Sequence, residues 1–473
     1  MKPEPYAQPS ALPTQRSGAP DRPGTAALLL MLAGTFIVVL DFFIVNVALP
    51  SVQRELHASA GTLQLVVAGY GLANAAGLVT GGRLGDLYGR RRVFMLGMLA
   101  FALASLACGL APTGAILVGA RVLQGAAGAL MQPQVLAMIG LAFTGEQRTR
   151  AFAAYGLTLG LGAALGQLVG GFLIDANLFG LGWRNCFLIN LPIAAVALLL
   201  APRYIPPLAN AGTSRLDLLG TVLAAAASVA VVLPLVEGRE QGWPAWSFAL
   251  LAAAAPLLAA FLAYQKRLAA AGGAPLVAPE LLRHRGFVAG LGVSLMFYVG
   301  NASLYFALAL YLQQRLGLPP LRSGLVFTVM AVGFFVTSMA APRLARRFGG
   351  PPIAGGALLL AAGHLLQFAN LAWLPPHDAL WRMLPLLFVQ GLGLGVVMAP
   401  LVSAILAGLP PQHAGVASGV LSMVQQAGNA LGVALIGLVY YTHGFAASLV
   451  YLAASAVGVA LLWRRAASAR AGA

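Results

Sequence analysis

The sequence predicts an all-α polytopic membrane protein with fourteen transmembrane helices: two six-helix bundles related by pseudo-two-fold symmetry, plus two inserted helices. Three observations predict this fold. Of the 473 residues, 60% are hydrophobic and only 8% are charged, against about 25% charged residues in an ordinary soluble domain. The apolar residues form runs of about 20 residues, the length that crosses a bilayer as a helix. Motifs of the first half recur about 260 residues later.

The predicted helices follow one another with short connections. The first six cover approximately residues 25–50, 61–82, 93–111, 114–142, 151–174 and 184–201. Two more follow at 216–236 and 246–265. The last six cover 286–312, 321–342, 352–374, 380–407, 413–440 and 445–463. The domains are therefore a disordered cytosolic tail at 1–24, an N-terminal bundle at 25–201, a linker with the two extra helices at 202–285, a C-terminal bundle at 286–463, and a cytosolic tail at 464–473.

This composition excludes a soluble globular enzyme, a disordered chain and a secreted disulfide scaffold. The tail at 1–24 contains six prolines and no apolar core, so it is not a signal peptide. Cys108 and Cys186 fall in or beside apolar runs, so we expect buried thiols rather than a disulfide, and no metal-ligand spacing is present. Two lysines against 26 arginines, with abundant Ala and Gly, favour a GC-rich bacterium and its inner (cytoplasmic) membrane.

The positive charges indicate the orientation. The net charge is +16, but the basic residues sit in small clusters between apolar runs and form no single patch, which argues against nucleic-acid binding. With both termini in the cytosol, 21 of the 28 Lys and Arg residues lie on the cytosolic side, six lie outside, and Arg121 lies within a helix. This bias predicts two cytosolic termini.

An internal repeat supports the two-bundle fold. Residues 82–89 resemble residues 342–349, at an offset of 260. Gln124-Gly125 resembles Gln390-Gly391 at 266, and residues 166–170 resemble residues 428–432 at 262. Three matches at nearly one offset predict two related halves in the same orientation, because eight helices separate equivalent positions.

Two charges lie in the middle of predicted spans. A charge at the centre of the bilayer costs at least about 2.5–3.5 kcal/mol. Asp41 lies about 13 Å from the outer end of its helix and Arg121 about 10 Å from the outer end of its own, at 1.5 Å per residue. The similar depths indicate that the two side chains pair or share a water-filled cavity. We interpret Asp41 as a proton site that is tuned by Arg121; the alternative is a structural ion pair.

Polar side chains avoid lipid and turn inward, so others in the predicted spans are candidates for a substrate cavity. Asn301 lies 260 residues after Asp41 and is its repeat equivalent; Tyr305 lies one turn later. We expect both to face the same cavity from the second half, the alternative for Asn301 being a helix-contact role. The further candidates are Asn46, Gln124, Gln132, Gln390, Gln425 and Gln426.

Two glycine-rich segments are candidates for moving parts. The loop at 82–92 is crowded with charge, and its glycines are expected to permit a tight turn, with its acid latching onto an arginine or a helix N-terminus. The predicted gating residues are Gly82, Gly85, Asp86, Gly89, Arg90 and Arg91. In the helix at 151–174, small residues about four apart favour close helix contact. This helix-packing motif comprises Gly162, Gly166, Gln167, Gly170 and Gly171.

These motifs resemble the major facilitator superfamily, over essentially the whole chain after residue 25. GRLGDLYGRRR at 82–92 resembles its signature loop, and RVLQGAAGALMQP at 121–133 resembles its helix-4 motif. LDFFIVNVALP at 40–50 resembles the helix-1 motif of the fourteen-helix drug:proton antiporters of EmrB/QacA type, which WRNCFLINLP at 183–192 and QQAGNALGVALIG at 425–437 also fit. The resemblance implies that Asp41 is the proton or substrate acid, Arg121 the coupling arginine and Asp86 the gating acid.

Two departures from that family pattern bear on function. The antiporter motif of the fifth helix reads roughly G-P-x-x-G-G, whereas this chain has Gln167 in place of the proline. No acid lies mid-membrane in the second half, which argues for monovalent, zwitterionic or neutral substrates.

The sequence therefore predicts a proton-coupled secondary transporter that exports small amphipathic or hydrophobic compounds by alternating access. Its expected partners are a small-molecule substrate, protons and membrane lipid; it is expected to be a monomer without cofactor, metal or catalytic residues, with a periplasmic adaptor left undecided. The first alternative is a proton-coupled importer or exporter of a specific metabolite, which Gln167 favours. A remote alternative is a polytopic membrane enzyme, but the helix-end acids Asp175, Glu146 and Asp217 have no partner His or Ser at useful spacing.

Overall fold

The computed structural model describes residues 24–207, 216–373, 379–407, 409 and 414–471. Except for Gly24, the predicted tail at 1–24 lies outside the described residues, as does part of the predicted linker. The described residues form helices and connecting turns without a strand. The all-α fold is therefore confirmed.

The N-terminal helices match the predicted spans closely. They are α1 (Thr25–Leu56), α2 (Ala60–Tyr88), α3 (Arg90–Gly109), α4 (Gly114–Ala142) and α5 (Gly145–Ala176). The sixth span covers Gly182–Tyr204. It follows the short turn η1 (Leu178–Gly180) and comprises η2 (Gly182–Arg184), α6 (Asn185–Leu188) and α7 (Asn190–Tyr204), and the backbone of Ile189 between the last two is also helical. Most helices extend past the apolar runs that predicted them, because polar residues at the membrane surface continue a helix as readily as apolar ones.

The inserted pair and the second half follow. The inserted helices are α8 (Leu218–Glu240) and α9 (Ala245–Ala270), and the turn η3 (Leu281–Arg283) leads into the second half. That half contains α10 (Arg285–Leu310), the π-helical turn η4 (Tyr311–Arg315), α11 (Pro320–Arg347), α12 (Ile353–Trp373), α13 (Ala379–Leu406) and α14 (Ala414–Ala471).

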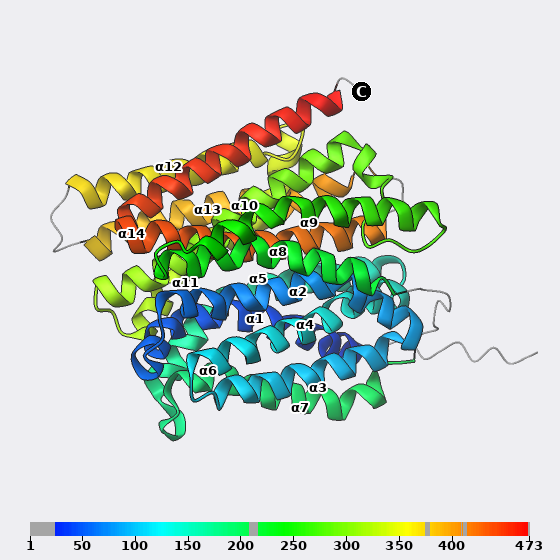
Figure 1. The fold of residues 1–473 in the computed structure, drawn as a ribbon, viewed down its shortest axis with the longest axis horizontal. Helices are drawn as coiled ribbons and strands as arrows, with labels where there is room; N and C mark the ends of the chain where they lie inside the picture. Colours follow the sequence, from blue (N-terminus) through cyan, green and yellow to red (C-terminus); the bar gives the residue numbers. More distant parts are fainter. Residues whose placement is uncertain (1–23, 208–215, 374–378, 408, 410–413, 472–473) are drawn as a thin grey trace, which may run out of the picture.

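The described residues contain 13 helices that are long and apolar enough to cross a membrane. The last candidate span, 51 residues long, would measure about 77 Å if straight, more than twice the hydrocarbon thickness of about 30 Å. Helix α14 is instead non-helical at Gly444, with φ +80° and ψ −173°, a conformation essentially confined to glycine. Figure 1 shows the orange and red parts of α14 on either side of this bend. They correspond to the predicted spans 413–440 and 445–463.

Two groups of helices lie on opposite sides of the molecule (Figure 1). Helices α1–α4, α6 and α7 form one side, and α10 and α12–α14 form the other. Within the first group α2 and α3 pack on α4, and within the second α11 and α12 pack on α13. Helix α5 packs on α1 and belongs with the first group, and α11 belongs with the second through its contact with α13. The main contacts between the groups join α2 to α14 and α5 to α11, while α8 lies against both α2 and α14.

The two groups repeat one another in the details of helix contact. A Cβ at Gly125 of α4 would collide with the carbonyl oxygen of Tyr70 on α2, and a Cβ at Gly391 of α13 would collide with that of Met330 on α11. Gly97 of α3 abuts residues 130 and 131 of α4, and Gly356 of α12 abuts residues 396 and 397 of α13. The internal repeat inferred from the sequence is therefore visible in how the helices touch, with offsets of 259 for α3 to α12 and 266 for α4 to α13.

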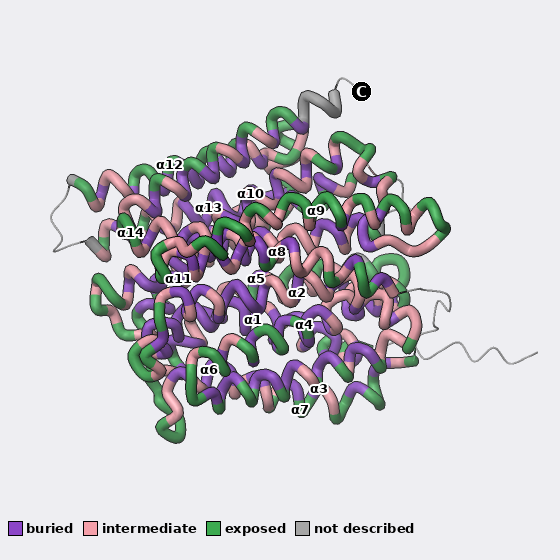
Figure 2. Tube along the Cα trace, viewed as in Figure 1, coloured by how far each residue is buried: buried purple, intermediate pink, exposed green. Residues whose placement is uncertain are grey.

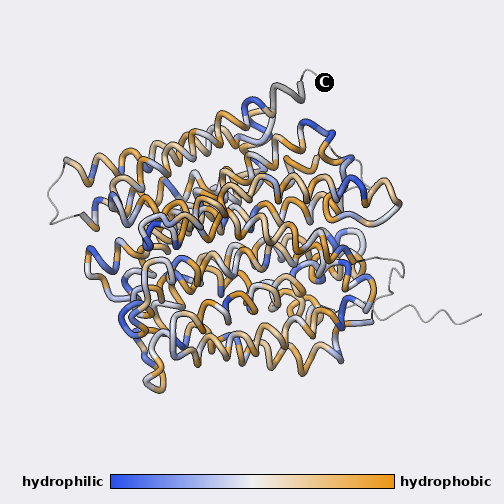
Figure 3. The backbone as a smooth tube through the Cα atoms, in the orientation of Figure 1, coloured by the Kyte–Doolittle hydropathy of each residue, from blue (hydrophilic) through white to orange (hydrophobic). Residues whose placement is uncertain are grey.

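The outer surface of the helices is apolar. Large hydrophobic side chains such as Leu199, Met339 and Trp381 are 78%, 81% and 72% exposed. Figures 2 and 3 show the exposed outward parts of the peripheral helices as largely hydrophobic. A soluble monomer rarely exposes apolar surface on this scale, whereas helices in lipid satisfy their backbone internally and present apolar side chains outward.

Substituting Gly125 tests the close approach of α2 and α4. Gly125→Ala should destabilise the protein by about 1–3 kcal/mol, because the added methyl has no room beside backbone atoms. Thermal unfolding in detergent measures the effect. The matched control is Gly119→Ala on the same helix, where a Cβ meets nothing within 4 Å. Equal melting temperatures for the two variants would contradict this account of the helix contact.

Candidate functional site

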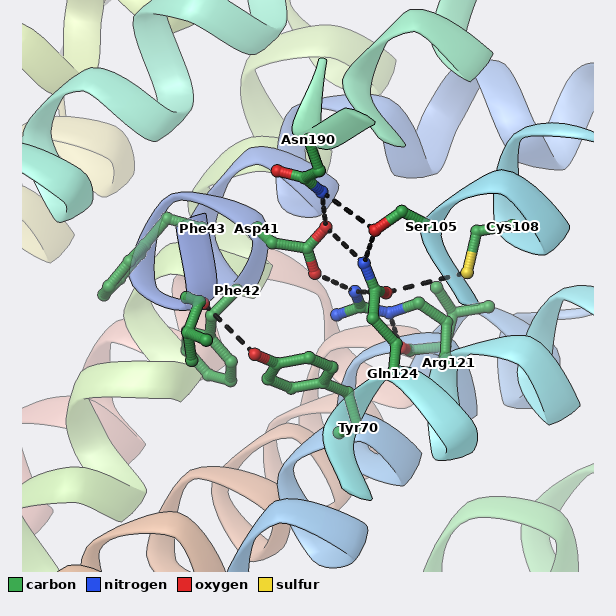
Figure 4. Close-up of polar contacts among 12 residues, drawn as sticks. Asp41, Phe42, Phe43, Tyr70, Ser105, Cys108, Arg121, Gln124 and Asn190 are labelled. Carbon is green, nitrogen blue, oxygen red and sulfur yellow. Dashed lines mark hydrogen bonds and ion pairs between the residues drawn. The ribbon is translucent and has the colours of Figure 1, made fainter. Parts of the chain in front are cut away.

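A buried ion pair occupies the middle of the N-terminal helices (Figure 4). Asp41 lies on α1 and Arg121 on α4; Oδ2 of Asp41 accepts a hydrogen bond from Nη1 of Arg121. Both side chains are 0% exposed. The two side chains, which the sequence places at similar depths, are thus in direct contact and do not share an open cavity.

The second carboxylate oxygen of Asp41 is held by two amides. Gln124 Nε2 and Asn190 Nδ2 each donate to Oδ1 at 2.8 Å. Both amides also donate to Oγ of Ser105, at 2.8 Å and 3.3 Å. Asp41 is therefore fixed by donors from α4 and α7, and Ser105 of α3 fixes those donors.

Besides Asp41, Arg121 contacts a backbone carbonyl oxygen, an amide oxygen and an aromatic ring. Its Nε donates to the carbonyl oxygen of Val66 at 2.9 Å, and its Nη1 also donates to Gln124 Oε1 at 2.7 Å. The guanidinium carbon lies 4.3 Å from the ring centroid of Tyr70, within the range of a cation–π contact. Nη2 has no hydrogen-bond partner among the described residues, so two of the five N–H donors of the guanidinium are unused there.

Sequence reasoning did not single out Asn190 and Ser105. Asn190 lies in the motif at 183–192, at the first residue of α7. Ser105 gave no signal, since a serine in an apolar run is commonplace. Tyr70 stacks on Arg121 and donates its hydroxyl to the carbonyl oxygen of Val38 at 3.2 Å.

The residues predicted to line a substrate cavity lie in several different surroundings. Gln124 belongs to the ion-pair cluster. Asn46 turns back on its own helix, donating to the carbonyl oxygens of residues 42 and 43 at 3.3 Å and 3.2 Å. Gln390 is buried between α12 and α13, where it donates to the carbonyl oxygen of residue 363 at 3.3 Å. Gln132 is half-buried on α4.

Asn301 does not share a cavity with Asp41, contrary to expectation. It lines a small cavity enclosed by α10, α12, α13 and α14, within the second group of helices. The rotation of α10 about its axis turns residue 301 into that group instead of toward the first one. One turn later, Tyr305 does lie between the groups, with its ring 4.8 Å from that of Phe43 and 5.6 Å from that of Phe327.

A chain of amides joins the two groups of helices. Gln426 of α14 donates to Oδ1 of Asn74 on α2 at 2.9 Å, and Asn429 donates to Oε1 of Gln426 at 2.9 Å. Asn74 donates in turn to the carbonyl oxygen of Gly125 on α4 at 3.2 Å. Gln425 is half-buried beside this chain, and its Nε2 has no partner among the described residues.

The predicted gating loop is mostly helical, which corrects the expected role of Gly85. Gly89 alone makes the turn between α2 and α3, with φ +94°. Gly85 lies within α2, buried where a Cβ would collide with the side chain of Gln134 on α4, so the glycine allows close helix contact rather than a turn. Gly82 is likewise helical, and a Cβ there would lie 3.5 Å from Pro133.

The charges of this segment tie it to the linker. Asp86 of α2 forms an ion pair with Arg90, the first residue of α3, across the turn at Gly89. Arg83 donates to the carbonyl oxygens of residues 274 and 275. Arg91 donates to those of Pro202 at 3.2 Å and Ile205 at 2.9 Å. The α2–α3 turn is thereby attached to the segments on both sides of the inserted helix pair.

The glycines of α5 allow three helices to meet. Gly162, Gly166 and Gly170 face α1, whereas Gly171 faces the backbone at Pro320 of α11. Gln167 is fully buried, and neither polar atom of its side chain has a partner among the described residues. The helix that carries the predicted small-residue stripe therefore also makes one of the two main contacts between the groups.

Comparison with known proteins agrees with this architecture. Residues 31–433 and 290–472 match the family described as Major Facilitator Superfamily. A probable actinorhodin transporter of Streptomyces coelicolor is 40% identical, over 92% of this chain and 77% of the relative. The puromycin resistance protein pur8 of Streptomyces alboniger is 38% identical over 91% and 85%. A cephamycin export protein, CmcT, of Amycolatopsis lactamdurans is 35% identical over 89% and 86%.

Solved structures share the fold at low sequence identity. A POT family transporter superposes with a TM-score of 0.69 at 15% identity, covering 93% of this chain and 95% of the other. The xylose transporter XylE from E. coli, in a partially occluded inward-open conformation, gives 0.64 at 15%, covering 93% and 98%. The chain belongs to the Major Facilitator Superfamily. It is a multi-pass membrane transport protein, and the remote alternative of a membrane enzyme is set aside.

Removing one member of the buried ion pair should destabilise the protein. Arg121→Leu leaves a buried carboxylate without its counter-charge and should lower the free energy of unfolding by about 3–5 kcal/mol. Adding Asp41→Asn to this variant should recover much of the loss, because the uncompensated charge is removed. Chemical or thermal unfolding in detergent measures both effects.

The control is Arg150→Leu. Arg150 pairs with Glu146, but the two side chains are 75% and 78% exposed, and such surface pairs contribute at most about 1 kcal/mol. If Arg121→Leu cost no more than Arg150→Leu, the ion pair would not be the buried element described here.

Proposed function

We propose that this transporter exports small amphipathic compounds in exchange for protons, by alternating access between its two groups of helices. The names of three relatives, which describe an actinorhodin transporter, puromycin resistance and cephamycin export, support efflux of antibiotic-like molecules. The single observation that carries the proton coupling is the desolvated Asp41–Arg121 pair. We further propose a monomer in the bacterial inner membrane with both termini in the cytosol, as the distribution of basic residues indicates.

The pair suits a cycle of protonation. When a proton binds to Asp41, the negative charge that Arg121 neutralises disappears, while Arg121 keeps its hydrogen bonds to Val66 and Gln124. The guanidinium then carries an uncompensated charge in a low-dielectric site, which favours a conformation that hydrates it or offers it another acceptor. In the described conformation Asp41 is closed off from solvent, so proton entry belongs to another state. One charge moving down 100 mV supplies about 2.3 kcal/mol, and a pH gradient adds to it.

The amide chain offers a route from the pair to the second half. Tyr70, which stacks on Arg121, and Asn74 lie one turn apart on the same face of α2. Asn74 holds Gln426 of α14. A shift of Arg121 therefore displaces the face of α2 that bonds to the second half.

A second set of hydrogen bonds joins the two groups of helices at the end of the molecule that we assign to the outside. Gln313 donates to the carbonyl oxygen of Val47 at 2.9 Å, and Gln314 donates to Gln53 Oε1 at 2.8 Å. The backbone N–H of Leu321 donates to Oδ2 of Asp175 at 3.1 Å. We propose that these contacts form an outer gate that opens when substrate leaves.

The second candidate function is uptake of a specific metabolite with protons. Gln167 favours it, because this unpartnered glutamine stands where the resembled antiporter motif has proline. Transport into right-side-out membrane vesicles against inverted ones distinguishes the two directions.

Neutralising Asp41 tests the proton coupling. In liposomes with an imposed pH gradient, with puromycin and a panel of fluorescent dyes as probes, Asp41→Asn should reduce proton-driven transport to the level of protein-free liposomes. Exchange of labelled for unlabelled probe without a gradient should continue, because the pathway itself is intact. The matched control is Glu146→Gln, an exposed acid, which should transport normally. Full gradient-driven transport by Asp41→Asn would refute the assignment.

Removing the amide contact tests the link between the halves. Gln426→Leu should shift the ratio of conformations by roughly 2- to 13-fold, the equivalent of one hydrogen bond of about 0.5–1.5 kcal/mol. Spin labels at the exposed residues Leu141 and Met339 report the populations through distance distributions.

A variant of Asn74, the other member of this hydrogen bond, shows whether the effect comes from the bond itself. Asn74→Leu should produce a similar shift, and the double variant should add little to either one, since both lose the same bond. Gln147→Leu, at an exposed glutamine, is the control. Distance distributions of Gln426→Leu that match those of the unaltered protein would show that the contact does not bias the conformations.

A further inference from the structure

One face of α11 runs from apolar side chains that face lipid directly into a group of arginines. Its apolar members are 50%, 51% and 81% exposed and are Val332, Val336 and Met339. Its basic members are exposed at the end of the same helix and are Arg343, Arg346 and Arg347. At 100° per residue these six positions fall within an arc of about 100°. We call them the α11 stripe, and its arginines continue the face that the apolar residues present to lipid.

The arginines of the α11 stripe have no carboxylate of their own half to pair with. From residue 286 onward the one acid in the sequence is Asp378, which follows α12, whereas the arginines precede that helix. None of the three arginines forms an ion pair with an acid among the described residues. On α5, which packs on α11, the acid at the same end is Glu146, and it pairs with Arg150. Three positive charges at this end of α11 are therefore left without a counter-charge from the protein.

The first half shows that the fold itself does not need these charges. At the repeat offset of 260, Arg343 corresponds to Arg83, which donates to the carbonyl oxygens of residues 274 and 275. Arg346 corresponds to Asp86, which pairs with Arg90. The first half thus has an acid and protein acceptors at the place where the second half has an additional arginine and an exposed face.

A phospholipid fits this arrangement. Arg343 lies four residues beyond Met339, a rise of about 6 Å along the helix, so a lipid whose chains cover Met339 has its headgroup near the guanidinium groups. Guanidinium binds phosphate oxygens with paired hydrogen bonds. A zwitterionic headgroup would also bring an ammonium group toward three arginines with no carboxylate to receive it, which favours a headgroup with net negative charge.

We propose that the α11 stripe binds an anionic phospholipid, with its acyl chains along the apolar members and its phosphate at the arginines. Charge complementarity and the continuous lipid-facing arc support this occupant. The inference holds whether or not the proposed proton coupling and direction of transport are correct, because it concerns the outer surface of one helix and not the pathway between the halves.

Quenching of a fluorophore by brominated lipid measures which lipid lies on the α11 stripe. A bimane label on Met339→Cys is selective, because the native thiols of Cys108 and Cys186 are 0% exposed. The vesicles are of phosphatidylcholine, with a fraction of either brominated phosphatidylglycerol or brominated phosphatidylcholine. Phosphatidylglycerol should bind roughly 5-fold better, the equivalent of about 1 kcal/mol for one arginine at a membrane surface. Salt at about 1 M should remove the preference, because the Debye length falls to about 3 Å.

Two triple variants with the same loss of charge locate the binding site. The first removes the basic part of the α11 stripe and combines Arg343→Gln, Arg346→Gln and Arg347→Gln; the two lipids should then quench equally. The control removes three exposed arginines at the same end of the first half and combines Arg92→Gln, Arg148→Gln and Arg150→Gln. The control should keep the roughly 5-fold preference.

Equal quenching by the two lipids in the labelled protein with all its arginines would overturn the proposal, since the arginines would then be hydrated only. A preference lost equally in both triple variants would also overturn it, because the lipid would respond to net charge alone. Should the stripe variant fail to fold, a label on Leu103→Cys, at a position 59% exposed on α3, still decides. A preference there equal to that at residue 339 would show general attraction of the lipid without a site on α11.

Discussion

The constraint on which the first half depends is the cost of holding Asp41 in a region without water. A single charge there is unfavourable by several kcal/mol, and a counter-charge repays this only when the remaining lone pairs and protons are also satisfied. The surrounding residues meet that condition for the carboxylate: Arg121 takes one oxygen, and Gln124 and Asn190 take the other. Donors from two helices, α4 and α7, therefore hold the one carboxyl group that α1 places between them.

The same constraint explains what could be predicted from the sequence. Charges in apolar runs are so costly that their presence singles out Asp41 and Arg121, and helix rise alone places them at matching depths. Apolar length likewise predicts nearly every span. Rotation about a helix axis is different, because it is set by contacts with neighbouring helices: Asn301 occupies the predicted repeat position but faces its own half, and Gly85 serves helix contact rather than a turn. Ser105 carries no sequence signal, and Asn190 is only one of several polar residues in the predicted spans, because the importance of both comes from what they touch.

A second feature of the structure is the set of glycines that allow close contact between helices. Gly125 and Gly391 permit backbone contact at equivalent places in the two halves, while Gly171 and Gly324 permit it between the halves, at α5 and α11. Contacts of this kind bring the helix backbones close together. A side-chain hydrogen bond accompanies the contact at Gly125, from Asn74, and another joins α5 and α11 near Gly171, from Leu321 to Asp175. The polar contacts between the halves, by contrast, are few and discrete, as at Asn74 and Gln426. A structure of this type can exchange one set of discrete bonds for another while its helices remain intact.

The second half indicates whether this fold needs a buried ion pair. If the bundle needed a buried ion pair to fold, the second half, which repeats the same helix contacts, would need one too. It has Asn301 and Leu387 where the first half has Asp41 and Arg121, and both halves bury their positions equally well. Neutral residues are therefore sufficient for this arrangement of helices. Because an apolar replacement of a buried pair is commonly neutral or stabilising, the pair in the first half is better explained by work that a neutral site cannot perform, and a change of protonation is work of that kind.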